Sequence, residues 1–133
     1  MGMDIGIILE IHTAGGWRAV PRGEYLGGEW AGARSRDTFA FLTGITHAHD
    51  GIVYEPQIPD RGWPDDATQP GFDGPYGTFG HTWATVCELR ALPWETNGLG
   101  GQDFRRWLHT PEMDALVAEH GADGVRVLMD FDN

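Results

Sequence analysis

Residues 4–12, Asp-Ile-Gly-Ile-Ile-Leu-Glu-Ile-His, alternate in the manner of a β-strand and decide the fold. One face of this strand carries only aliphatic residues, namely Ile5, Ile7, Leu9 and Ile11. Residues 13–16 have the composition of a tight turn, and Trp17 to Val20 read as the returning strand. The amino-terminal end of the chain is therefore predicted to be a β-hairpin with one buried face.

Cap residues predict three helices further along. Gly44 ends a helix at about 36–43, for which Ser35 is the expected N-cap. Thr85 and Glu88 have the spacing of a capping box, which predicts a helix over residues 86–92. Thr110-Pro111 begins a third helix, which runs to about residue 120.

The remaining segments complete the expected fold. Residues 125–131 alternate as a final apolar strand, and residues 103–108 are expected to form one or two helical turns. Residues 21–34, 55–80 and 96–102, rich in glycine or proline, are predicted to be loops or links. We expect a single α+β domain, residues 1–133, with a small antiparallel sheet covered on one face by short helices.

Charge and composition restrict the function classes. The formal net charge is −11, which argues against binding to duplex nucleic acid or to an anionic membrane. All nine basic residues are arginines, whose planar forks suit phosphate or carboxylate groups. One cysteine, no leader-like start and no long apolar stretch lead us to expect a cytoplasmic protein, and nothing in the sequence indicates a cofactor.

Five segments, in order, resemble motifs of small proteins from tailed bacteriophages and actinobacterial prophages. The family motifs are M-G-C-D-I-H, R-(D/N)-Y before F-A-x-L, P-R-G-L-P-x-D, G-H-S-H-S-W-L-T and V-R-I-V-F-x-F-D-N. They correspond here to residues 1–6, 36–42, 59–65, 77–85 and 125–133. The resemblance spans nearly the whole chain and implies a phage origin rather than a particular chemistry.

The chain departs from these motifs at two histidine positions. Gly6 stands where the family's opening motif has histidine, and Thr78 or Phe79 replaces the first histidine of its paired run. If the relatives bind a metal through those histidines, this protein is not expected to bind one in the same way.

Residues 78–85, Thr-Phe-Gly-His-Thr-Trp-Ala-Thr, combine an imidazole, a hydroxyl and an indole. They follow a glycine-rich loop and precede the predicted helix at 86–92. We therefore expect His81 and Thr82 to lie beside a helix N-terminus, where unpaired backbone N–H groups favour anions.

The leading functional hypothesis is a phage anti-defence protein that sequesters a small, anionic, nucleotide-like immune signal in the bacterial host. Indoles would stack on a base, and arginine forks would pair with phosphates. Such a protein is expected to be a homo-oligomer. The predicted ligand-binding residues are Trp30, Arg34, Arg36, Arg61, Trp63, His81 and Thr82.

The first alternative is a hydrolase that cleaves such a signal, with His81 and Thr82 as the catalytic candidates. A metal-free phosphodiesterase needs a second histidine–hydroxyl pair, for which residues 12–13 and 109–110 are the candidates. A metal-dependent route would use His47 and His49, which are weak candidates as metal ligands. The candidates for a third metal ligand beside His47 and His49 are Asp4, Glu10, His12 and His81.

The second alternative is an acidic inhibitor that binds a host protein in place of nucleic acid. Its acidic residues are scattered along the chain, so this hypothesis ranks third. The clusters at residues 65–66 and 130–132 are interpreted as solvated surface.

Overall fold

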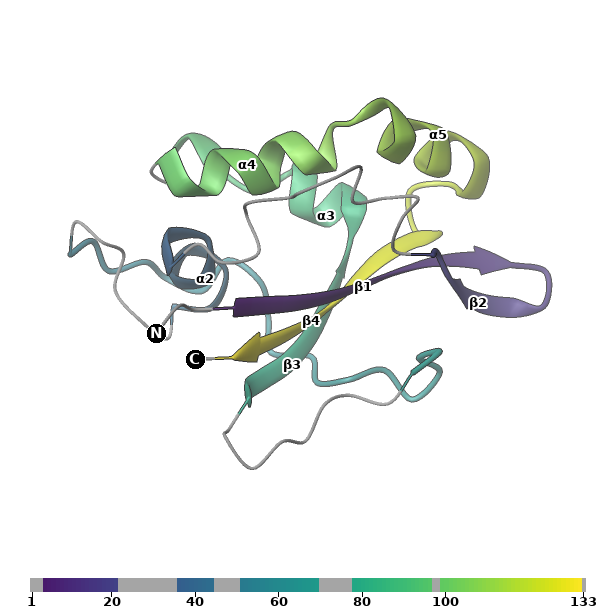
Figure 1. Cartoon of the computed structure of the whole chain (residues 1–133), viewed down its shortest axis with the longest axis horizontal. Helices are drawn as coiled ribbons and strands as arrows, with labels where there is room; N and C mark the ends of the chain where they lie inside the picture. Colours follow the sequence, from purple (N-terminus) through teal and green to yellow (C-terminus); the bar gives the residue numbers. More distant parts are fainter. Residues whose placement is uncertain (1–3, 22–35, 45–50, 70–77, 97–98, 133) are drawn as a thin grey trace.

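A computed structural model describes residues 4–21, 36–44, 51–69, 78–96 and 99–132. These residues form an α+β fold, which confirms the predicted class (Figure 1). In chain order, the elements are β1 (Asp4–Thr13), β2 (Gly16–Ala19), α2 (Arg36–Thr43), β3 (Thr78–Thr85), α3 (Val86–Arg90), the 3-10 turn η2 (Trp94–Thr96), α4 (Leu99–Leu108), α5 (Pro111–His120) and β4 (Val125–Asp132).

The strands form one antiparallel sheet in the order β2-β1-β4-β3. The hairpin predicted from residues 4–20 is present, and it turns through Gly16 at a φ of 104°. β1 and β4 are the two central strands, and their register places Leu9 opposite Val127. The two most apolar strands therefore lie side by side in the middle of the sheet.

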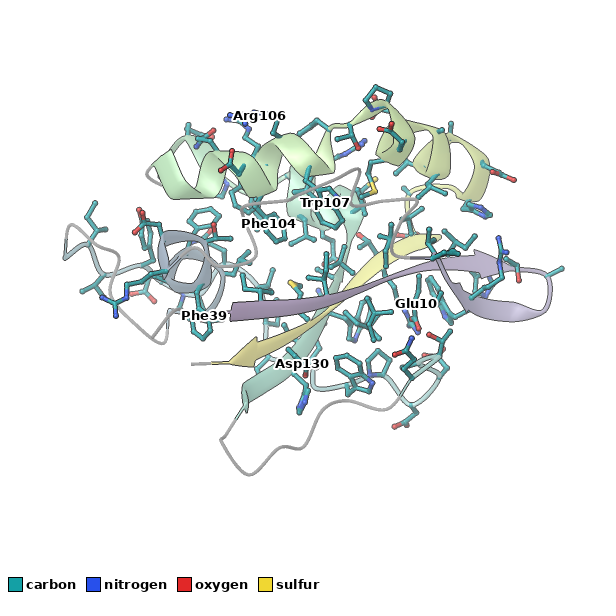
Figure 2. All side chains as sticks on the ribbon, viewed as in Figure 1. Glu10, Phe39, Phe104, Arg106, Trp107 and Asp130 are labelled. Carbon is teal, nitrogen blue, oxygen red and sulfur yellow. The ribbon has the colours of Figure 1, made fainter. Side chains whose placement is uncertain are left out.

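The aliphatic face of the sheet packs against the helices, which we call the helical layer. Figure 1 shows α3, α4 and α5 together on one side of the sheet. Phe104 and Trp107 of α4 point from this layer toward the strands (Figure 2). They join a core in which Leu9, Val127 and Phe39 are fully buried. Burial of this kind supplies the main stabilisation of a small domain.

The cap residues act as the sequence predicts. Thr85 accepts a hydrogen bond from the backbone N–H of Glu88, whose carboxylate accepts one from the N–H of Thr85, so the capping box is complete. Thr110 caps α5, with Pro111 in its first turn. Gly44 follows α2 at a φ of 67°, where a side chain would meet Pro56 at 2.9 Å. Ser35 lies outside the described residues.

Residues 78–85 form a strand that the sequence analysis does not predict, and the expectation that residues 78–80 belong to the long loop 55–80 is wrong. β3 pairs with β4 along its length, with a register irregularity between Thr78 and Gly80. His81 therefore lies in mid-strand, and not at a helix N-terminus. The short helix α3 starts only at Val86, and Thr85 already accepts from the N–H of Glu88.

Helix boundaries differ from the predictions at two further places. α4 begins at Leu99, inside the glycine-rich stretch interpreted as a link, because burial of Phe104, Trp107 and Leu108 outweighs the low helix propensity of glycine. α3 ends at Arg90 instead of residue 92, because the residue before Pro93 is disfavoured in helical conformation.

The face of the sheet turned away from the helices, which we call the second face, is also partly covered. Residues 59–69 pass from the helical layer around β3 and lie across this face (Figure 1). Glu10 and Asp130 point to the same side, opposite to Phe104 and Trp107 (Figure 2). The expectation of one covered face is therefore incomplete.

Candidate functional site

Strand periodicity selects the residues of the second face. Alternate residues of a strand share a face, and the sheet register aligns them across strands. Glu10 of β1 lies opposite Arg126 of β4, and His81 of β3 lies opposite Asp130 of β4. The second face thus carries charged pairs at positions where the other face carries aliphatic residues.

A buried ion pair lies at one end of this face. The Nε of Arg126 donates to Oε1 of Glu10 at 2.8 Å, and both residues are almost inaccessible to solvent. The other oxygen of Glu10 accepts from the backbone N–H and the hydroxyl of Thr68, at 2.7 and 2.6 Å. Nη2 of Arg126 also donates to Asp66 at 3.0 Å. These bonds fix residues 66–68 onto the sheet.

Aromatic rings surround the same guanidinium group. The Arg126 guanidinium lies 3.8 Å from the ring centre of Trp17 and 5.8 Å from that of Trp83. Arg61 lies over Trp83 at 4.7 Å. Cations and indoles therefore form one continuous group across β2, β4 and β3, in which cation–π attraction adds to the ion pair.

His81 forms the other end of the second face. Its Nε2 lies 2.7 Å from Oδ1 of Asp130, and both side chains are about four-fifths buried. Its ring and that of Trp63 form a T-shaped contact, with a centroid distance of 5.4 Å. Trp63 is held in turn by a hydrogen bond from its indole N–H to the carbonyl of Gln69. Residues 59–69 thus place the partly exposed indole of Trp63 beside the imidazole of His81, which Asp130 orients.

Arg61 is tied to the edge of β3. Its guanidinium forms a two-pronged ion pair with Glu88 and also donates to the carbonyl of Trp83 at 3.0 Å. The hydrogen bond to Arg61 lowers the pKa of the Glu88 carboxyl, and the same contact raises the pKa of Arg61. A phosphate would have to compete with Glu88 for this arginine.

Thr82 points to the opposite face from His81, because neighbouring strand residues alternate. Its hydroxyl donates to the carbonyl of Pro59 at 2.6 Å and accepts from the N–H of Arg61 at 3.0 Å. Thr82 therefore anchors residues 59–61 where the chain passes around β3. The geometry therefore does not support His81 and Thr82 as a catalytic couple acting on one ligand.

Four predicted ligand-binding residues come from two stretches that the structure brings into contact, namely Arg61, Trp63, His81 and Thr82. Arg36 instead begins α2, which packs against α4 and β1 in the helical layer. Four other candidates lie outside the described residues, namely Trp30, Arg34, His47 and His49. Their predicted roles stay predictions.

The second histidine–hydroxyl pair of a metal-free phosphodiesterase is not placed near His81. His12 lies six residues along β1 from Gly6, which faces Asp130, and six strand residues span about 20 Å. His109 lies between α4 and α5, and Thr110 caps α5. Among the described residues, no three acidic, histidine or cysteine side chains form a group that could hold a metal ion.

Sequence reasoning missed the residues that organise this face. The sequence offers Glu10 only as a third metal ligand, whereas it is the buried partner of Arg126. The acidic positions interpreted as solvated surface include Asp130, which is about four-fifths buried beside His81, and Asp66, which contacts Arg126. The available signal was a glutamate and an arginine within otherwise apolar strands, since such residues are seldom fully buried unless paired.

Comparisons with known proteins give no relative for this chain: no protein-family model, curated protein or solved structure matches it. Within the described residues, none of the helices combines the length and the apolar character needed to cross a bilayer.

Proposed function

We propose that this protein is a phage accessory protein that binds and sequesters a small, anionic, nucleotide-like immune signal at the second face. The observation that carries the proposal is the contact between Trp63 and His81, which brings an indole and an imidazole together from distant parts of the chain. Trp63 is partly exposed and offers a surface on which a base can stack. His81 offers a polar group directly beside it. In this proposal the protein acts in the cytoplasm of the infected bacterium as a homo-oligomer.

The charges of the second face limit what it can bind. Arg61 is paired with Glu88, and Arg126 is paired with Glu10 and Asp66. An anionic ligand must therefore share or displace a carboxylate, and a strongly negative protein repels highly charged ligands. These conditions favour a ligand with a large stacking surface and few charges.

Calorimetric titration with cyclic dinucleotides, cyclic trinucleotides and ADP-ribose derivatives tests the proposal. At least one of these compounds should release or absorb heat at tens of micromolar protein. Trp63→Ala should weaken that binding by about tenfold, because stacking of a base on an aromatic ring contributes about 1–3 kcal/mol. Arg106→Ala, which removes an exposed arginine of α4, should leave the affinity unchanged.

Two outcomes would contradict the proposal. One is the absence of heat with every compound, and the other is unaltered affinity of the Trp63→Ala variant. Thermal unfolding of both variants checks that they remain folded at the temperature of the titration.

The second candidate function, a hydrolase, is favoured by one observation, the pairing of His81 with Asp130 at 2.7 Å. A carboxylate that orients a histidine is a common arrangement in general acid–base catalysis. Chromatography of each ligand after incubation separates the two functions, because a sequestering protein returns the ligand intact and a hydrolase returns product. A parallel incubation with a chelator distinguishes a metal-dependent hydrolase from a metal-free one.

A further inference from the structure

Asp66 and Glu10 hold the same guanidinium group in very different surroundings. The side chain of Arg126 is 4% exposed and that of Glu10 is fully buried, whereas the side chain of Asp66 is 64% exposed. Arg126 therefore has one partner inside the protein and one at its surface. Asp66 is thus the carboxylate partner of Arg126 that solvent reaches.

The two carboxylates are not equally replaceable. Glu10 accepts from Arg126 through one oxygen and from Thr68 through the other, so its removal would leave a buried charge and two donors without their partner. Asp66 is largely hydrated, and an ion pair with one exposed partner contributes little to stability. An external anion can therefore compete with Asp66 but not with Glu10.

The position of Arg126 is fixed before any ligand arrives. The ring centre of Trp17 lies 3.8 Å from the guanidinium carbon, and Oε1 of Glu10 lies 2.8 Å from both Nε and Nη2. A guanidinium held in this way keeps its planar donors aligned for an oxygen of a carboxylate or phosphate. Little conformational entropy is lost when one acceptor oxygen replaces another at Nη2.

We propose that Asp66 is an internal substitute for the acidic group of the ligand, and that a singly charged phosphodiester displaces it from Arg126. This inference rests on the proposed function for the class of ligand. Exchange of one single negative charge for another conserves the local charge, whereas a phosphomonoester carries roughly two at neutral pH and adds repulsion from Glu10. The second face therefore selects phosphodiesters over monoesters.

Cyclic AMP and 5′-AMP are suitable probes, because they share base and sugar but carry a diester and a monoester. Calorimetric titration of Asp66→Asn should show cyclic AMP binding about fivefold tighter than to the unmodified protein, since the competing carboxylate is gone. The matched control is Asp65→Asn, which removes the same charge from the adjacent exposed position. This control should change the affinity by less than about twofold, because exposed charges are screened.

A second readout follows the guanidinium group directly. In ¹H–¹⁵N spectra of the Asp66→Asn variant, the Nε–H signal of Arg126 should shift on addition of cyclic AMP, and 5′-AMP should need a higher concentration for the same shift. Equal affinities of the two aspartate variants, a stationary Arg126 signal, or tighter binding of 5′-AMP than of cyclic AMP would each overturn the inference.

Failure of this inference can be distinguished from failure of the proposed function. If a compound of the nucleotide panel binds in a Trp63-dependent manner but the two aspartate variants are alike, the proposed function stands and this inference fails. If no panel compound binds the unmodified protein but Asp66→Asn gains affinity for cyclic AMP, Arg126 is an anion site and the sequestering role fails.

Discussion

Replacement of Glu10 by glutamine is expected to lower the free energy of unfolding by about 3–5 kcal/mol, the usual effect of removing one partner of a buried ion pair. The guanidinium of Arg126 would stay buried with only the exposed Asp66 as a charged partner. Thr68 would lose the carboxylate that accepts from both its N–H and its hydroxyl. Urea unfolding followed by circular dichroism measures the change.

The matched control for this prediction is Glu55→Gln, which makes the same chemical change at an exposed position. It should alter stability by less than about 0.5 kcal/mol. The double variant Glu10→Leu with Arg126→Leu should be destabilised by clearly less than the sum of the two single variants, because no unpaired charge remains. Additive effects, or a Glu10→Gln variant as stable as the control, would show that the pair is not buried as described.

Replacement of Trp94 by alanine is expected to cost about 3–5 kcal/mol of stability, as for other fully buried aromatic residues. Its ring stacks on Phe104 at 5.3 Å and packs against Phe41 at 4.8 Å. Its indole N–H donates to the carbonyl of Leu89 at 2.6 Å. The substitution would thus remove the centre of the packing among η2, α2, α4 and α3. The change is measured by the same urea unfolding.

Trp63→Ala provides the comparison for Trp94→Ala, because Trp63 is a partly exposed tryptophan within residues 59–69, which lie across the second face. Its replacement should cost less stability than that of Trp94 while weakening ligand binding. A reversed order of stabilities would contradict the placement of Trp94 in the core and of Trp63 at the partly exposed second face.

Local signals made much of the fold predictable. The alternation in residues 4–12 and 125–131 identified the two central strands, and the caps at Thr85 and Thr110 identified two helix starts. β3 escaped prediction because Gly80 and the glycine-rich stretch before it indicate a loop, although its threonines, Phe79 and Trp83 are residue types that favour strands. It is a strand because β4 supplies a hydrogen-bonding partner along its length, which no local pattern reveals.

The candidate site was less predictable, because long-range contacts define it. Glu10 and Arg126 are separated by 116 residues, and Thr68 reaches Glu10 across 58. The sequence analysis included Trp63 and His81 in one predicted ligand site, and the structure brings these two rings into contact. It could not indicate that Thr82 faces away, since that follows from the strand conformation of residues 78–85.

The central claim, that a nucleotide-like ligand binds on the second face, is tested most directly by the indole N–H signals in ¹H–¹⁵N spectra during titration with the nucleotide panel. The account predicts that one compound shifts the signal of Trp63, with smaller shifts for Trp83 and Trp17. Trp94 and Trp107, which lie in the helical layer, should not move. The claim would be contradicted if no compound shifted any indole, or if the shifts were confined to Trp94 and Trp107.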